Sequence, residues 1–363
     1  MSLSRLTVEN LRNIRHVDLT LNPGVNLVWG ENGSGKTSLL EAIYFLGSSR
    51  TFRGVRIDPV INRDATAATV FGVVNAAEGR RRIGVQRGRA GTKDIKINGE
   101  VVRKASELAQ ALPVLVLGPE TVDLLLGAPG GRRRFLNWGL FHVEHGFLQD
   151  WETAVRCLKQ RNSLLRAKGS EQELAVWSSR LVKASEALDR YRAAYFGVFS
   201  GLFADACSNL SRLTAVDCIY HRGWDAGRSL ADVLASQEEG DRKRGFTLSG
   251  FQKADFEVRV AGQNAVGVCS RGELKVLAWA LVLSQGLMSR KRQQQTLVYL
   301  VDDLCAELDL ASRKRVCDEI IKSGGQVVAT GIDLKQLVES WVGIDTKVFH
   351  VEHGRFSETE SSI

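Results

Sequence analysis

The sequence predicts an α/β protein in which one sheet domain is interrupted by a helical insertion. The nearly continuous apolar strand at 25–29 runs into a glycine-rich loop and then a helix at 37–46, which is the strand–loop–helix order of a parallel sheet. Residues 132–213 contain no proline and no alternating strand pattern, as is typical of helices. Strands and helices alternate again after residue 241. We therefore expect the two outer segments of the chain to form one domain.

The composition is that of an ordinary globular protein. Its 363 residues allow two or three domains, and 44% hydrophobic with 25% charged residues exclude a disordered chain or a disulfide-stapled miniprotein. The six cysteines form no C-x-x-C pair, so we expect buried free thiols. The longest apolar run, 276–283, is far shorter than the ~20 residues that cross a bilayer. The chain opens on an alternating strand pattern without a signal-peptide core, and we expect a cytoplasmic protein.

Alternating apolar residues in the first third of the chain predict an antiparallel β subdomain. The first hairpin is expected to turn through residues 10–13, and the dipeptide Asn98-Gly99 is the strongest short hairpin signal. The helix at 37–46 is expected to stop at Gly47. The predicted strands of this subdomain are 3–8, 17–21, 67–74, 80–86 and 94–97.

The positive charge of the protein is concentrated in one stretch of sequence. The net charge is +8, and residues 50–104 hold 13 Lys or Arg against 5 Asp or Glu, whereas the remainder holds 36 against 36. A concentrated basic face attracts polyanions, and nucleic acid is the commonest polyanion for a cytoplasmic protein. A solvated basic surface without a partner is the alternative.

Two consecutive helices are predicted in the helical insertion. Apolar residues step by three and four from Leu174 to Leu202, and the same spacing runs from Trp151 to Leu165, with a turn at 167–170. This pattern predicts an antiparallel helical hairpin whose long arm measures about 50 Å at ~1.5 Å per residue. An ordinary helical subdomain, with the stripe as its core, is the alternative. Beyond it we expect strands at 256–261, 297–301, 326–329 and 347–351 and helices at 270–285 and 311–322, with a charge-rich loop from residue 241.

The glycine-rich loop fits the phosphate-binding pattern G-x-x-x-x-G-K-[ST] at the strand-to-helix turn where it is required. Its backbone amides and the helix N-terminus can surround phosphates. Lys36 is expected to reach the β and γ phosphates, and Thr37 to ligate magnesium. The sequence therefore predicts binding of a nucleoside triphosphate. The residues expected to bind it are Gly30, Glu31, Asn32, Gly33, Ser34, Gly35, Lys36 and Thr37.

A second buried strand, 297–301, ends in two carboxylates, Asp302 and Asp303. Asp302 is expected to hold the magnesium through water, and Asp303 to orient the attacking water. With Lys36 they are the predicted catalytic residues. Alternatively, the two aspartates only cap the next turn.

Two further motifs have ordinary structural explanations. The S-x-x-E pattern of Ser270 and Glu273 predicts a capping box at the start of a helix. The pairs His142/His145 and His350/His353 lack the H-E-x-x-H order, so we expect surface or packing histidines.

Taken together, the order of these motifs resembles the ATPase heads of the ABC and SMC families. Along essentially its whole length the chain resembles the RecF family of bacterial recombination-mediator ATPases. The segments that carry the resemblance are 10–13, the glycine loop with 39–43, 132–139, 159–162, 253–256, 270–275 and 302–309.

The resemblance implies a P-loop ABC/SMC-type ATPase head with an antiparallel β subdomain and an inserted helical arm domain. The head would comprise residues 1–125 and 241–363, and the arm residues 126–240. In such heads the serine-glycine signature of one subunit closes on the nucleotide of the other, so Ser270 and Gly272 would act in trans in an ATP-dependent homodimer. Arg12 and Asn13 match the family's N-terminal loop at the nucleotide, and Leu117–Glu120 lies about where a phosphate-sensing loop is expected.

The implied function is a weak, DNA-stimulated ATPase that binds double-stranded and gapped DNA and helps RecA displace single-strand binding protein with RecO and RecR. Arg271, Glu273, Asp303 and Thr330 depart from transporter heads, and the shorter Asp303 fits slow hydrolysis. The main alternative is a transporter-type nucleotide-binding subunit; a scaffold for which ATP is only a ligand is a third hypothesis.

Overall fold

The structure, a computed structural model, describes residues 1–54, 56–293 and 297–359. It divides the chain into two compact units. The first is formed by the described residues of 1–121 and 294–363, and the second by residues 122–293.

A six-stranded sheet that is parallel except at one edge positions the glycine loop in the first unit. The strand before the loop, β3, lies in its interior between β14 and β13, and Val25, Leu27 and Val28 of β3 are fully buried, as expected for an interior strand. The edge strand β15 pairs antiparallel with β14. In sheet order the strands are β15 (Arg355–Thr359), β14 (Thr346–Glu352), β3 (Val25–Trp29), β13 (Gln326–Gly331), β12 (Val298–Val301) and β8 (Val114–Leu117).

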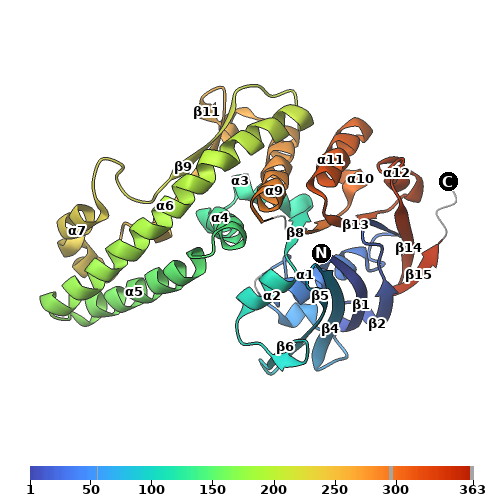
Figure 1. Cartoon of the computed structure of the whole chain (residues 1–363), viewed down its shortest axis with the longest axis horizontal. Coiled ribbons are helices and arrows are strands. Elements are labelled where there is room, and N and C mark those ends of the chain that lie inside the picture. The colour runs from blue at the N-terminus through green and yellow to red at the C-terminus, as the bar shows by residue number, and fades with distance from the viewer. Residues whose placement is uncertain (55, 294–296, 360–363) are drawn as a thin grey trace. The chain divides into compact units, whose positions relative to one another are not determined.

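The second six-stranded sheet of this unit is antiparallel, which confirms the predicted β subdomain (Figure 1). The predicted turn at Asn98-Gly99 is present, with φ of 54° and 92°, the left-handed values that a tight hairpin needs. In sheet order the strands are β2 (Ile14–Thr20), β1 (Ser2–Leu11), β4 (Ala67–Ala76), β5 (Gly79–Gly88), β6 (Lys93–Ile97) and β7 (Glu100–Val101).

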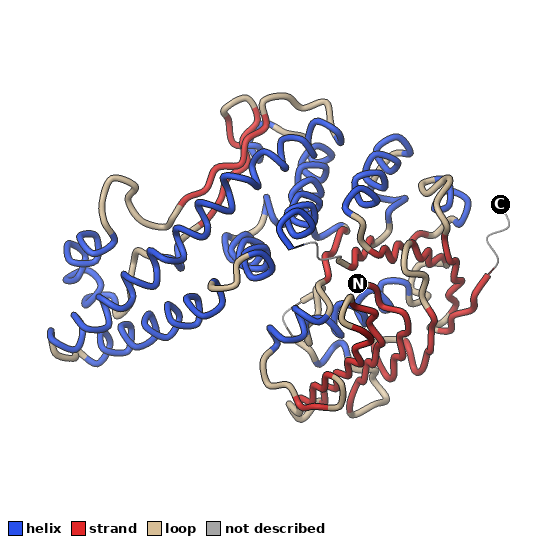
Figure 2. Tube along the Cα trace, in the orientation of Figure 1, coloured by secondary structure: helices blue, strands red, loops and turns tan. Residues whose placement is uncertain are grey.

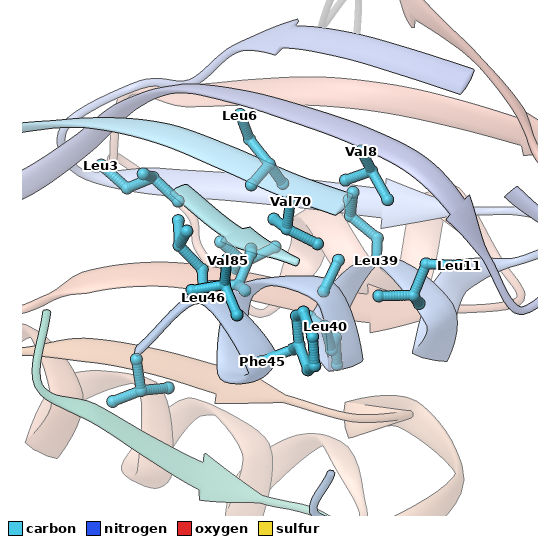
Figure 3. Close-up of a cluster of buried hydrophobic side chains, with 14 of the residues drawn as sticks. Leu3, Leu6, Val8, Leu11, Leu39, Leu40, Phe45, Leu46, Val70 and Val85 are labelled. Atoms are coloured by element: carbon cyan, nitrogen blue, oxygen red, sulfur yellow. The ribbon is translucent and has the colours of Figure 1, made fainter. Parts of the chain in front are cut away.

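Helix α1 (Lys36–Ser48) contacts strands of both sheets, and its apolar side chains are the centre of the first unit's core. Figure 3 shows Leu39 of α1 near Val8 of β1, and Leu40 beside Phe45 of the same helix. The predicted stop at Gly47 is wrong, because the helix continues to Ser48. Gly47 serves close packing instead, since a Cβ there would lie 2.6 Å from the carbonyl oxygen of Leu112. The other helices of this unit are α2 (Ala105–Ala111), α10 (Leu304–Glu307), α11 (Leu310–Ser323) and α12 (Leu334–Glu339).

The second unit is built on the predicted helical hairpin. Helices α5 (Phe147–Ala167) and α6 (Glu171–Leu210) pack along each other and are joined at Lys168, whose left-handed φ of 52° reverses the chain (Figures 1 and 2). A three-stranded antiparallel sheet, ordered β11-β10-β9, belongs to the same unit. Its other elements are α3 (Asp123–Leu126), α4 (Pro129–Val143), β9 (Val216–His221), α7 (Leu230–Arg244), β10 (Asp255–Val260), β11 (Gln263–Asn264), α8 (Ala265–Val268) and α9 (Arg271–Gln293).

The predicted apolar stripe of α6 coincides with the buried face of the helix only over the first half of the helix. Leu174, Leu181 and Leu188 are buried as expected, but farther along Phe199 and Phe203 are buried, whereas the predicted Val198 and Leu202 are half-buried. A straight α-helix has 3.6 residues per turn, so its buried face drifts away from a strict seven-residue repeat. The stripe is thus the core of a helical subdomain against which β9 and α9 also pack.

Residues 241–293 lie in the second unit because β10 pairs with β9 along its whole length and α9 packs on α6. The expected charge-rich loop from residue 241 is wrong: α7 extends to Arg244 and ends at a left-handed Gly245. The functional division into a head (1–125 and 241–363) and an arm (126–240) stays a prediction. None of the helices in the described ranges has the length and apolarity needed to cross a membrane.

Candidate nucleotide site

The glycine loop joins β3 to α1, and Lys36 is the first residue of the helix. The Lys36 ammonium group donates hydrogen bonds to the carbonyl oxygens of Gly30 at 2.7 Å and Glu31 at 2.9 Å. Desolvation lowers the pKa of Lys36, an effect opposed by the nearby carboxylates of Asp303 and Asp302. The ammonium group therefore lies folded over the loop, on the side of the two aspartates.

Asn13, in the turn between β1 and β2, fixes the shape of the loop. Its Nδ2 donates to the carbonyl oxygens of Gly33 at 3.2 Å and Ser34 at 3.1 Å, and its Oδ1 accepts from the Ser38 hydroxyl at 2.7 Å. One carboxamide thus joins the loop to the first turn of α1. These contacts position the loop; the expected contact of Asn13 with phosphate or base stays a prediction.

A second hairpin turn, His353-Gly354 between β14 and β15, supports the loop from another direction. The Gly354 amide donates to the Ser34 carbonyl oxygen at 2.7 Å. A Cβ at Gly354 would lie 2.3 Å from the Asn13 carbonyl oxygen, so only glycine allows this approach. This contact was not predicted from the sequence, although a glycine turn after an alternating strand is a signal of the hairpin that makes it.

The side chain of Arg12 forms an ion pair with Glu41. Its Nε and Nη2 donate to the fully buried Glu41 carboxylate of α1 at 2.6 and 2.9 Å, and its Nη1 donates to the Pro59 carbonyl oxygen at 2.7 Å. The bidentate pair fixes the guanidinium group on α1, and the bond to Pro59, together with one from the Arg12 amide to the Val60 carbonyl oxygen at 2.7 Å, holds segment 58–64 beside Arg12. Arg12, Asn13, Gly33, Ser38, Arg89 and parts of that segment line a cavity of about 830 Å³. The cavity is next to the glycine loop, because Gly33 of the loop and Ser38 of α1 are part of its wall.

Asp302 follows β12, and its Oδ1 accepts hydrogen bonds from the hydroxyl groups of Thr37 and Thr330, each at 3.0 Å. The structure therefore brings together the two residues that were expected to hold magnesium. Thr330, fully buried on β13, also accepts from the Asp303 amide at 2.8 Å. Its bridging position was missed in the sequence, where Thr330 was only noted as a departure from transporter heads.

Asp303 has a left-handed backbone with φ of 51°, unusual for a residue with a side chain. Such conformations cluster at functional sites, where the surrounding structure holds them in place. The predicted sensing loop lies on the other side of Asp302, because the Asp302 amide donates to the Leu117 carbonyl oxygen at 2.8 Å and a Cβ on Gly118 would lie 3.1 Å from that of Asp302.

The signature residues Ser270 and Gly272 lie at the start of α9, in the second unit. The predicted capping box is confirmed: the Ser270 amide donates to the Glu273 carboxylate at 2.8 Å, and the Glu273 amide donates to the Ser270 hydroxyl at 3.3 Å. The Glu273 carboxylate is thus turned back onto the helix start, and hydrogen bonds from Ser270 lower its pKa. The action of Ser270 and Gly272 on a partner's nucleotide stays a prediction.

Two of the four singled-out histidines pack against aromatic rings. The ring centroids of His142 and Trp138 and those of His350 and Trp29 are 4.2 Å apart.

The donor set suits a magnesium–triphosphate complex. The loop amides and the Lys36 ammonium group match phosphate oxygens, and a hydroxyl group beside a carboxylate, Thr37 with Asp302, matches the oxygen ligands of magnesium. Bound there, the cation would neutralise charge on the phosphates. Fold and site together define a P-loop nucleotide-binding head with an inserted helical arm.

Comparison with known proteins agrees with this class. The family model for the RecF/RecN/SMC N-terminal domain matches residues 2–355. The DNA replication and repair protein RecF of Stutzerimonas stutzeri is 44% identical over 99% of this chain and 98% of its own length, and that of Azotobacter vinelandii is 44% identical over 99% of each chain. The chain belongs to the RecF family. A structure described as the recombination mediator protein RecF with ATP in the RecFOR pathway has the same fold, with a TM-score of 0.87 at 23% identity over 99% of this chain and 98% of that one.

Proposed function

We propose that this protein is a cytoplasmic, ATP-dependent DNA-binding protein of recombinational repair and replication-fork maintenance. It binds double-stranded or gapped DNA and helps load RecA at single-strand gaps together with RecO and RecR. The observation that carries the proposal is the nucleotide site, in which Lys36, Thr37 and Asp302 meet at one turn. The names of the relatives, DNA replication and repair protein RecF, support the role in repair.

In the proposed cycle, ATP with magnesium bridges two copies of the chain. Lys36 binds the phosphates, Thr37 and Asp302 hold the metal, and Asp303 orients the attacking water. Ser270 and Gly272, at the N-terminus of α9, bind the nucleotide of the other copy, where helix N-terminal amides favour an anion. Slow hydrolysis then separates the two copies and releases the DNA.

Basic residues at the end of α1 and on the antiparallel sheet are the proposed contacts to DNA phosphates. Desolvation, followed by repulsion from Arg87 and Arg50, lowers the pKa of Lys93. Desolvation and then repulsion from Arg50 lower the pKa of Arg87. These three cations therefore lie close enough to repel one another. A phosphate group bound among them would relieve this repulsion.

The alternative of a transporter-type nucleotide-binding subunit is not favoured. The reported relatives are DNA replication and repair proteins. Thr330 replaces the switch histidine of transporters, and in this chain its hydroxyl group bridges Asp302 and Asp303.

Sedimentation of the purified chain tests the proposal, with and without magnesium-ATP and a gapped duplex. The wild type should dimerise only with ATP and bind the duplex more tightly as a dimer. Lys36→Ala should lose ATP binding and the dimer together, while Ser270→Arg should keep ATP binding in the monomer and block dimerisation. A dimer of Lys36→Ala without nucleotide, or monomers only at saturating magnesium-ATP, would contradict the bridging cycle.

A further inference from the structure

The second unit contains a cavity of about 430 Å³ that the nucleotide chemistry does not use. It lies where α4, α5 and the loop at 246–253 meet. Three of the segments that carry the family resemblance, 132–139, 159–162 and 253–256, contribute residues to its wall. The lining residues that matter below are Arg133, Leu158, Asn162, Phe246, Gln252 and Lys253.

The wall carries positive charge that a ligand can use. Within the described ranges, neither Arg133 nor Lys253 forms a side-chain hydrogen bond or an ion pair. The carboxylate in the wall, Asp255, is already bound by Arg132, whose Nε and Nη2 donate to its two oxygens at 2.7 and 2.9 Å. The cavity therefore offers two cations to an incoming anion.

The wall also offers one hydrogen-bond donor. The Oδ1 of Asn162 accepts from the Thr247 amide at 2.9 Å and hydroxyl at 2.7 Å, while its Nδ2 has no hydrogen-bonding partner among the described residues. The Nε2 of Gln252 donates to carbonyl oxygens of its own loop, at Thr247 and Ser249, and its Oε1 is buried, so Gln252 shapes the wall without offering a polar group to a ligand. The free Asn162 donor complements the C=O of a peptide group.

An exposed aromatic side chain, Phe246, lines this cavity beside an anchored stretch of backbone. Phe246 is 44% exposed, yet the adjoining residue Thr247 receives a 2.7 Å hydrogen bond from the buried Arg161. Arg161 in turn pairs with Asp241 at 2.7 Å, and both side chains are at most 1% exposed. The other oxygen of Asp241 accepts from the Leu248 amide at 3.0 Å. A buried ion pair therefore anchors the start of the loop.

A second buried arginine anchors the other end of the loop. Arg192 donates from Nη1 to the Phe251 carbonyl oxygen at 2.9 Å and from Nη2 to the Asn137 side chain at 3.2 Å. Both ends of the loop are thus fixed in the free protein. A ligand pays little ordering entropy to bind such a pre-organised surface.

We infer that this cavity binds an acidic segment of a protein partner in which a carboxylate lies next to an apolar side chain. Arg133 and Lys253 bind the carboxylate, the Nδ2 of Asn162 donates to a carbonyl oxygen of the peptide backbone, and Phe246 with Leu158 covers the apolar side chain. A nucleic acid fits less well, because its phosphates need a continuous basic track and stacking surfaces, whereas this wall contains only two available cations and a carboxylate.

Fluorescence anisotropy with a labelled probe tests the inference on the full chain without ATP or DNA. The probe is fluorescein-labelled Asp-Glu-Asp-Leu with a free terminal carboxylate. The wild type should bind it saturably below about 1 mM. Arg133→Ala with Lys253→Ala should weaken binding at least about tenfold, and Phe246→Ser should weaken it severalfold.

The matched control is Arg134→Ala with Lys159→Ala, which removes two exposed cations of the same helices that do not line the cavity. This control should bind the probe within about twofold of the wild type, and all variants should keep the wild-type circular dichroism. The inference is overturned if the wild type does not bind the probe, if both double variants lose equal affinity, or if a short oligothymidine displaces the probe as well as unlabelled peptide does.

Discussion

At the scale of single residues, Thr330 organises the two consecutive aspartates after β12. Its hydroxyl group lies 3.0 Å from the Asp302 Oδ1 and accepts from the Asp303 amide at 2.8 Å. The Asp302 carboxylate is thereby held toward Thr37, and the left-handed backbone of Asp303 is held by a partly buried hydrogen bond. We therefore regard Thr330 as a positioning residue for the proposed hydrolysis.

Thr330→Val should slow ATP hydrolysis about tenfold, because valine removes both hydrogen bonds of the hydroxyl group, and a partner left unsatisfied costs ~1–3 kcal/mol. ATP affinity should change by less than about threefold, since Lys36 and the loop amides are untouched. Single-turnover hydrolysis and equilibrium nucleotide binding measure the two effects. Thr330→Ser, which keeps the hydroxyl group, is the control, and unchanged turnover in the valine variant would exclude a positioning role.

The thiol groups should react slowly with alkylating reagents at neutral pH. Desolvation raises the pKa of Cys207 to about 12 and also raises the pKa of the partly exposed Cys269 and Cys305. Because the thiolate is the nucleophile, a raised pKa lowers the reactive fraction, and the rate should climb as pH rises above 8. Mass spectrometry of iodoacetamide-treated native protein should find Cys269 and Cys305 modified first. The urea-unfolded protein is the control. If any cysteine of the native protein reacted at pH 7 as fast as it does in this control, the prediction would be contradicted.

At the scale of elements, local patterns predicted most of the fold, and the failures have physical causes. The glycine loop, the turn at Asn98-Gly99 and the α5–α6 hairpin depend on neighbouring residues and were predicted correctly. Strand β8 has only four residues and pairs with β12, about 180 positions away, so its own sequence gave too little signal.

The residues of the site show the same difference between features set by neighbouring residues and features set by distant ones. The loop and the Asp302–Asp303 pair could be recognised from short motifs, whereas the support from Gly354 and the bridge by Thr330 exist only because distant strands meet in one sheet. The expected helix end at Gly47 was wrong because this glycine is required for close packing against Leu112. Leu112 is distant in the sequence, so the residues around Gly47 do not reveal this contact.

The buried ion pair between α5 and α7 should contribute strongly to stability. Asp241→Ala leaves the Arg161 guanidinium buried without its carboxylate, which should lower the free energy of unfolding by ~3–5 kcal/mol. Urea denaturation followed by far-ultraviolet circular dichroism measures the loss. The control is Glu239→Ala, which breaks an exposed pair with Lys243 and should cost at most ~0.5 kcal/mol. Equal losses in the two variants would refute the assignment.

At the scale of the whole molecule, the two compact units carry different chemistry. The first contains the glycine loop, Asp302, Asp303 and the basic segment 50–104, and the second contains the capped helix start at Ser270 and the cavity lined by Arg133 and Lys253. Within a single copy, the two proposed halves of the ATP-bridged site therefore lie on different units. This division fits a homodimer in which ATP joins the first unit of one copy to the second unit of the other.

The salt dependence of DNA binding should reveal whether Arg50 and Lys93 contact DNA phosphates. Arg50→Ala with Lys93→Ala should weaken binding to a duplex and lower the slope of log affinity against log salt by about 2, one for each lost phosphate contact. Arg87 is kept because it donates to Ser49 at the end of α1. Titrations from 50 to 200 mM salt measure the slope. Arg5→Ala, whose charge Asp18 already balances, is the control, and an unchanged slope in the double variant would place the DNA elsewhere.

The order of strands in the parallel sheet has a consequence for biosynthesis. Strand β3 leaves the ribosome early, but its neighbours β13 and β14 lie some 300 positions later in the chain. At ~5–20 residues per second, translation takes about 15–60 s to supply them. Throughout that interval the apolar β3 has neither of its sheet partners, whereas the contiguous residues 122–293 are complete before β13 emerges. Nascent chains should therefore need chaperone protection of their first segment until synthesis is nearly finished.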